Sequence, residues 1–113
     1  MNTKVSFEGI GELAATFYHN DASKAALVTM SGSNRVKNCA SGETFIGVCI
    51  NVNDITAQVQ LHGYVQLPYT GTAPTVGFCS LAANGSGGVT AGNGREYLVL
   101  DVDTTDAVVG FML

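Results

Sequence analysis

The sequence predicts an all-β fold, either a small β-barrel or a β-sandwich, formed by a single domain over residues 1–113. Apolar residues alternate with polar ones or form short runs, and clusters of Gly, Asn, Asp and Ser separate these runs. Patterns typical of long helices are scarce. A chain of 113 residues also falls within the usual size of one domain.

The N-terminal third is predicted to form strands joined by short turns. Val5 and Phe7 alternate with polar residues, so residues 1–10 are expected to form an N-terminal arm or an edge strand. Residues 31–34, Ser-Gly-Ser-Asn, are typical of a hairpin turn. The strands expected here cover residues 13–19, 25–30 and 35–40.

One short helix is compatible with the sequence near residues 21–27. Asn20 and Asp21 are residues that cap helix N-termini, and good helix formers follow them over Ala22 to Leu27.

The strongest strand signals lie in the middle of the chain, where residues 45–52 and 55–67 are joined by Asn53 and Asp54. We expect the core there. Gly47 and Gly63 interrupt these runs, and glycine within a strand marks a bulge or a close backbone approach. Strong curvature of this kind favours a barrel over a flat sheet.

Pro68 lacks a backbone N–H group, so the strand is expected to end there, with a loop over residues 69–74. No internal repeat is apparent in the sequence. Residues 84–94 contain five glycines and are expected to be the most flexible stretch. The remaining expected strands cover residues 76–82, 96–103 and 107–113, the last two forming a hairpin around residues 104–106.

Charge and composition limit the classes of partner. The net charge is −4 and the five basic residues are scattered, which argues against nucleic-acid binding. The N-terminus lacks a signal-peptide pattern and no apolar run is long enough to span a membrane, so we expect a soluble chain made in the cytoplasm. Only 12% of the residues are charged, which suggests that part of the surface is covered by a partner, including other copies of the chain.

The cysteines and histidines do not form a recognisable reactive or metal-binding motif. The three cysteines are widely spaced, with no CxxC pair, so neither a disulfide framework nor a zinc site is indicated. A nucleophilic cysteine needs an oriented base, for which only two histidines are available. We interpret the cysteines as buried small residues, and His62 as a packed or rim residue of a strand. These residues are Cys39, Cys49, Cys79, His19 and His62.

Three further groups invite a functional interpretation that the sequence does not favour. Residues 84–88 are rich in glycine but lack the Lys-Ser/Thr pair and helix of a phosphate-binding loop. Asp101, Asp103 and Asp106 lack the glycine and distal glutamate of a calcium loop, so solvated carboxylates are favoured. The absence of Trp argues against a sugar-stacking platform of aromatic side chains. We expect core or subunit-interface roles instead for Tyr64, Tyr69, Phe78 and Tyr97.

These observations predict no enzyme activity. No catalytic, cofactor-binding or metal-ligating residue is assigned, because no paired acid and base, metal cluster or activated nucleophile is visible.

Several short packing motifs follow one another along residues 42–113 in an order that resembles a known family. Gly42–Val48 contains an F-x-G-V element, and Val59–Pro68 reads V-x-L-x-G-x-V-x-L-P. Val76–Leu81, a glycine-rich turn over residues 85–89, and a closing segment over residues 102–113 follow. Over residues 42–113 the chain resembles the capsid decoration, or cement, proteins of tailed bacteriophages.

The resemblance implies a structural virion protein that binds the outer surface of the capsid and stabilises the shell. Its implied partner is the major capsid protein, and its implied state is a homo-oligomer, with a trimer favoured. Two alternatives remain: another phage tail or fibre component, and a non-catalytic carbohydrate- or ligand-binding β-module.

Overall fold

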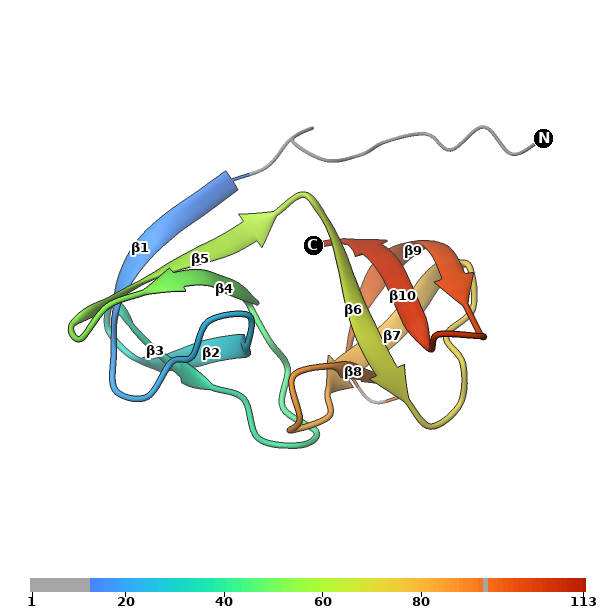
Figure 1. Cartoon of the computed structure of the whole chain (residues 1–113), viewed down its shortest axis with the longest axis horizontal. Helices are drawn as coiled ribbons and strands as arrows, with labels where there is room; N and C mark the ends of the chain where they lie inside the picture. The colour runs from blue at the N-terminus through green and yellow to red at the C-terminus, as the bar shows by residue number, and fades with distance from the viewer. Residues whose placement is uncertain (1–12, 93) are drawn as a thin grey trace.

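The protein is all-β, as predicted, and the ten strands of its described residues form two closed five-stranded barrels (Figure 1). The computed structural model describes residues 13–92 and 94–113, so the N-terminal arm expected over residues 1–10 lies outside the described residues. The strands are β1 Leu13–His19, β2 Leu27–Gly32, β3 Arg35–Asn38, β4 Gly47–Val52, β5 Thr56–His62, β6 Tyr64–Thr70, β7 Gly77–Ala83, β8 Val89–Ala91, β9 Arg95–Asp103 and β10 Val108–Met112.

The first barrel contains β1 to β5 in the spatial order β1-β3-β2-β4-β5. The predicted hairpin is confirmed: β2 and β3 pair in antiparallel fashion, and Asn34 in the turn between them has a φ of 57°. The strand β1 runs parallel to β3 and antiparallel to β5, and this second pairing closes the barrel. Along each strand, successive side chains point alternately into the small core of the barrel and toward its outer face.

The second barrel repeats this arrangement with β6 to β10, in the order β6-β8-β7-β9-β10. Here β6 runs parallel to β8 and antiparallel to β10. The two barrels therefore share strand order, pairing directions and the position of their single parallel pair. Figure 1 shows them side by side. The chain passes from the first barrel to the second between β5 and β6, at Gly63, whose φ is 110°.

The repeat extends to the last hairpin of each barrel, β4–β5 in the first and β9–β10 in the second. Each hairpin has a register shift that leaves one residue bulged, Ile50 between β4 and β5 and Leu100 between β9 and β10. Beside the bulge, Cys49 pairs with Val59 in one barrel as Val99 pairs with Phe111 in the other. This register makes Asn51 equivalent to Asp101, and Gln58 equivalent to Gly110.

The turns of the two hairpins are built in the same way. The side-chain oxygen of Asn53 accepts hydrogen bonds from the backbone N–H groups two and three residues later, at 2.9 and 2.8 Å. The side chain of Asp103 accepts the corresponding pair, at 2.9 and 3.1 Å. Asx turns of this kind fix the path of the chain. The barrel fold expected from the sequence is therefore confirmed, and it takes the form of two barrels with the same topology, a repeat that was not apparent in the sequence.

The larger of the two hydrophobic clusters joins the barrels. Phe45 precedes β4 of the first barrel, but its ring stacks on Tyr97 of the second, with centroids 4.9 Å apart. It also meets Phe111 edge to face at 6.1 Å, and the Tyr97 hydroxyl donates to the Phe45 carbonyl at 3.0 Å. The backbone of residues 42–43 adds two hydrogen bonds to Ala83, at 2.8 and 3.0 Å.

The first barrel has a smaller core of its own, in which small side chains are frequent. The buried members are Ala22, Val28, Val36, Cys49, Ala57 and Val59. The core predicted for residues 45–52 and 55–67 is thus divided between two clusters.

The structure contains no helix near residues 21–27, which corrects that expectation. Ala25 has a φ of 68°, a left-handed conformation that interrupts a right-handed helix. The Asp21 carboxylate accepts from the Asn38 N–H at 3.3 Å, and the Asn38 side chain accepts from the Ser23 N–H at 3.0 Å. These two hydrogen bonds to Asn38 of β3 engage the Asp21 carboxylate and the Ser23 N–H, so neither group is available to cap a helix.

The strand expected to end at Pro68 continues to Thr70. The Tyr69 N–H donates toward β10, to the Ala107 carbonyl, so the Pro68 nitrogen faces the opposite side of β6. On that side, β8 pairs only with Tyr69 and Thr70, so Pro68 removes no ladder hydrogen bond.

Candidate functional site

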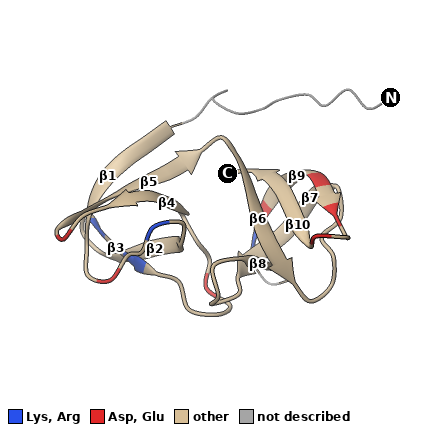
Figure 2. Ribbon diagram, viewed as in Figure 1, with Lys and Arg blue, Asp and Glu red and all other residues tan. Residues whose placement is uncertain are grey.

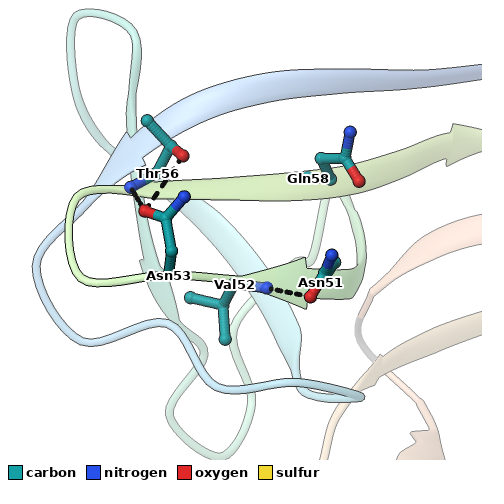
Figure 3. A pocket seen from close by; sticks show the side chains of 5 residues that line it. All are labelled: Asn51, Val52, Asn53, Thr56 and Gln58. Atoms are coloured by element: carbon teal, nitrogen blue, oxygen red, sulfur yellow. Dashed lines mark hydrogen bonds between the residues drawn. The ribbon is translucent and has the colours of Figure 1, made fainter.

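A polar depression lies on the outer face of the first barrel, over the β4–β5 hairpin (Figure 3). Its volume is about 330 Å³. The described residues that line it are all uncharged: Asn51, Val52, Asn53, Thr56 and Gln58.

The hairpin brings three amide side chains to this depression. Asn51 and Gln58 are cross-strand partners, and Asn53 begins the turn. The Asn51 side-chain oxygen accepts from the Val52 N–H at 3.0 Å, and the Asn53 oxygen accepts from Thr56 through N–H and hydroxyl (Figure 3). Within residues 13–92 and 94–113, the amide nitrogens of both asparagines and the whole Gln58 amide make no hydrogen bond.

The second barrel has a depression at the equivalent place, with a volume of about 250 Å³ and a different chemistry. It brings together the three predicted carboxylates, Asp101, Asp103 and Asp106. The Tyr64 hydroxyl donates to Asp101 at 3.0 Å across the space above Gly110. Among the described residues, no group of three His, Cys, Asp or Glu side chains has the arrangement of a metal site.

An exposed apolar surface, the apolar strip, consists of Val76, Phe78 and Leu98. Phe78 on β7 and Leu98 on β9 are direct cross-strand partners, with exposed fractions of 73% and 37%. Val76 precedes β7 and is 68% exposed. Apolar side chains gathered in this way mark interaction surfaces more often than isolated ones do.

The four aromatic residues expected in the core or at an interface separate into different environments. Tyr69 and Tyr97 are buried, Tyr64 is half-buried, and Phe78 is exposed in the apolar strip. The structure therefore does not bring the four together as one stacking platform.

Of the three cysteines expected to be buried, only Cys49 is; Cys39 and Cys79 are half-buried, which corrects that expectation for these two. Burial, with a smaller contribution from Glu43, raises the pKa of the Cys39 thiol to about 11, and burial also raises the pKa of Cys49. A raised pKa disfavours the nucleophilic thiolate. His19 accepts from the Ala22 N–H through Nδ1 at 3.1 Å and contacts the Asn53 carbonyl through Nε2 at 2.6 Å. His62 is exposed at the end of β5.

The glycine-rich segment is tied to the barrel by Asn84. Its side-chain oxygen accepts from the N–H groups of Ser86 and Gly88 at 2.8 and 3.1 Å, and its nitrogen donates to Thr70 at 3.2 Å. The strand β8 follows, so the segment does not lead into a helix as a phosphate-binding loop does.

The two barrels differ in net charge. Residues 64–113 contain four carboxylates and one basic residue, Arg95, whereas residues 13–62 contain three of each sign. Figure 2 shows the acidic groups near β9 and the turn before β10, and basic groups near β2 and β3. The described part of the chain has no helix of membrane-spanning length and hydrophobicity.

Comparisons with known proteins add no assignment. No family model matches this chain, and no curated protein matches it. The amide depression was missed from the sequence because Asn51 and Gln58 become neighbours only once the register of β4 on β5 is known. The signal present in the sequence was the recurrence of Asn and Gln around residues 51–60.

Proposed function

We propose that this chain is a structural virion protein that binds the outer surface of a tailed-bacteriophage capsid and stabilises the shell. The observation that carries the proposal is the apolar strip, because Phe78 and Val76 expose most of their surface to water. Leaving such surface exposed costs free energy that burial against a protein partner recovers.

The scaffold suits a protein that reinforces a shell. Each barrel is closed, and the ring of Phe45 links the two barrels through a buried aromatic cluster. A rigid binding surface loses little conformational entropy when it docks. The sequence resemblance over residues 42–113 supports the same role.

In this proposal the partner is the major capsid protein, and the chain acts as a homo-oligomer, with a trimer favoured. The protein is made in the cytoplasm of the bacterial host and resides on the capsid surface. A standard protein interface buries about 800 Å² on each partner, so polar neighbours of the apolar strip belong to the footprint as well.

Quantitative mass spectrometry of density-banded particles tests the proposal. We expect a copy number comparable with that of the major capsid protein. A few copies per particle would instead support a tail or fibre component, and absence from particles would overturn a virion role.

A second experiment tests the surface itself, with shells that lack this chain and purified protein added back. The double variant Phe78→Ser/Leu98→Ser should reduce occupancy on the shells by roughly tenfold or more, because two buried apolar contacts are lost. Ile55→Ser is the matched control: Ile55 is 64% exposed but lies in the first barrel's hairpin turn. Equal occupancy of the double variant and the control would exclude the apolar strip as the footprint.

A further inference from the structure

We propose that the amide depression over the β4–β5 hairpin is a binding site for a neutral carbohydrate, with Asn51, Asn53 and Gln58 as its hydrogen-bonding residues. This inference goes beyond the capsid role and is independent of it, because the depression and the apolar strip belong to different barrels.

The hydrogen-bonding groups suit sugar hydroxyls. A hydroxyl both donates and accepts, and a side-chain amide offers both kinds of group within one plane. The oxygens of Asn51 and Asn53 are occupied by backbone N–H groups, which orients the two amide nitrogens as donors. Gln58 keeps its oxygen and its nitrogen available beside them, since it has no partner among the described residues.

An aromatic residue is paired with one of the residues that line the depression. Tyr18 on β1 is the cross-strand partner of Thr56, which lines the depression, and Tyr18 is 52% exposed. The apolar C–H face of a sugar ring packs against aromatic rings, while the tyrosine hydroxyl remains available for a polar contact. The Arg35 guanidinium lies 5.8 Å from the centre of this ring, so Tyr18 offers a sugar only the part of its surface that Arg35 leaves exposed, beside the amides.

The second barrel acts as an internal comparison. Asn53 and Asp103 make equivalent turn bonds, so the turn itself does not require an amide rather than a carboxylate. At the other two positions, Asn51 replaces Asp101 and Gln58 replaces Gly110. The fold therefore accommodates either amides or carboxylates and glycine at these three positions. The first barrel differs from the second in presenting neutral amides on this surface.

Charge and topology favour a neutral glycan over the other ligands that amides bind. Among residues 13–92 and 94–113, the lining offers no charged side chain as a counter-charge for an anionic or cationic ligand. An added peptide strand needs an unpaired edge, whereas β4 and β5 are each paired on both sides. A volume of about 330 Å³ is at the lower end of small-molecule sites, which suits the end of a glycan rather than a long segment.

Nuclear magnetic resonance titration of the full-length, ¹⁵N-labelled protein tests the proposal. The probes are the methyl glycosides of glucose, galactose, mannose and N-acetylglucosamine, together with neutral, sialylated and sulfated oligosaccharides, at millimolar concentration. We expect the side-chain NH₂ signals of Asn51 and Gln58 to shift with at least one neutral probe. The variant Gln58→Ala should weaken that binding about tenfold, the usual effect of losing a hydrogen-bonded group.

Gln66→Ala is the matched control, because Gln66 is an exposed amide that lines the equivalent depression of the second barrel. It should bind the same probe as the unaltered protein does. Three results would overturn the inference: no shift with any neutral probe, a preference for the sialylated or sulfated probes, or equal binding by Gln58→Ala. None of them bears on occupancy at the capsid, so the two proposals fail separately.

Discussion

At the scale of single residues, Asn53 and Asp103 show how one structural task is done by two side chains of different charge. Each accepts two backbone hydrogen bonds in its own hairpin turn. The requirement is for an oxygen at a fixed distance from the backbone, which both residue types provide. The charge of the surface above the turn is therefore free to differ between the barrels.

Glu43 gives a prediction about pH. Its carboxylate accepts a hydrogen bond from the Ala40 N–H at 2.7 Å and lies 3.5 Å from the Lys37 ammonium; the first contact is the main reason that its pKa is lowered. A lowered folded-state pKa contributes stability above the ordinary value of 4.5, and this contribution is lost as the pH falls through the folded-state value. Glu43→Gln should therefore flatten the acid-side loss of stability, as measured by urea unfolding at a series of pH values.

The control for this prediction is Glu96→Gln, which removes one exposed carboxylate from β9. If Glu43→Gln and the unaltered protein lose stability equally between neutral pH and the acid range, the Ala40 contact contributes nothing to folding.

At the scale of elements, Gly110 allows β10 to run beneath a hydrogen bond. A Cβ atom at this position would overlap the Tyr64 hydroxyl and the Asp101 carboxylate, which bond to each other above it. Gly110→Ala should therefore lower the free energy of unfolding by about 1–3 kcal/mol, through displaced side chains and the weakened bond. Chemical denaturation measures this change.

Gly32→Ala is the control for that substitution. Gly32 also lies in a strand, but a Cβ atom there would meet nothing within 4 Å. This variant should be neutral or stabilised by up to about 1 kcal/mol, because alanine restricts the unfolded chain. Equal effects of the two substitutions would mean that crowding above Gly110 has no energetic weight.

The strands were largely predictable from the sequence, and the exceptions have physical causes. Alternation and turn residues located β1, the β2–β3 hairpin, β7 and the β9–β10 hairpin to within a few residues. The helix near residues 21–27 was wrong because Asp21 and Ser23 bond to Asn38, a long-range contact that local propensity does not contain. The end expected at Pro68 was wrong because its nitrogen faces the side of β6 on which no ladder bond is lost.

The repeat was not visible in the sequence because the barrels conserve positions rather than residue types. Register makes Cys49 equivalent to Val99, Ala57 to Val109, and Val59 to Phe111. All six are fully buried, and in each pair the second barrel has the larger side chain. Burial constrains polarity more strongly than identity, so two cores of different volume were built on one topology. The amide depression was hidden for the related reason that it depends on strand register.

At the scale of the whole molecule, Phe45 makes the second barrel depend on the first. It is buried among Tyr97 and Phe111, so Phe45→Ala should cost about 3–5 kcal/mol of unfolding free energy. Urea unfolding followed by circular dichroism and tyrosine fluorescence measures the loss. Phe78→Ala is the control, because the same atoms are removed from an exposed position and the expected change is within about 0.5 kcal/mol.

A cost no greater for Phe45→Ala than for Phe78→Ala would contradict the view that this ring joins the barrels. The view also requires that both spectroscopic probes report the same midpoint for the unaltered protein.

The placement of Phe45 has a consequence for the order of events on the ribosome. All strands of the first barrel have been synthesised once the ribosome reaches His62. The Phe45 ring has then been made as well, but Tyr97 and Phe111, against which it packs, have not. Translation at about 5–20 residues per second needs roughly 3–10 s to add residues 64–113. During that interval the nascent chain presents an unburied phenylalanine, the kind of group that chaperones bind, and β10 ends the exposure by bringing Phe111.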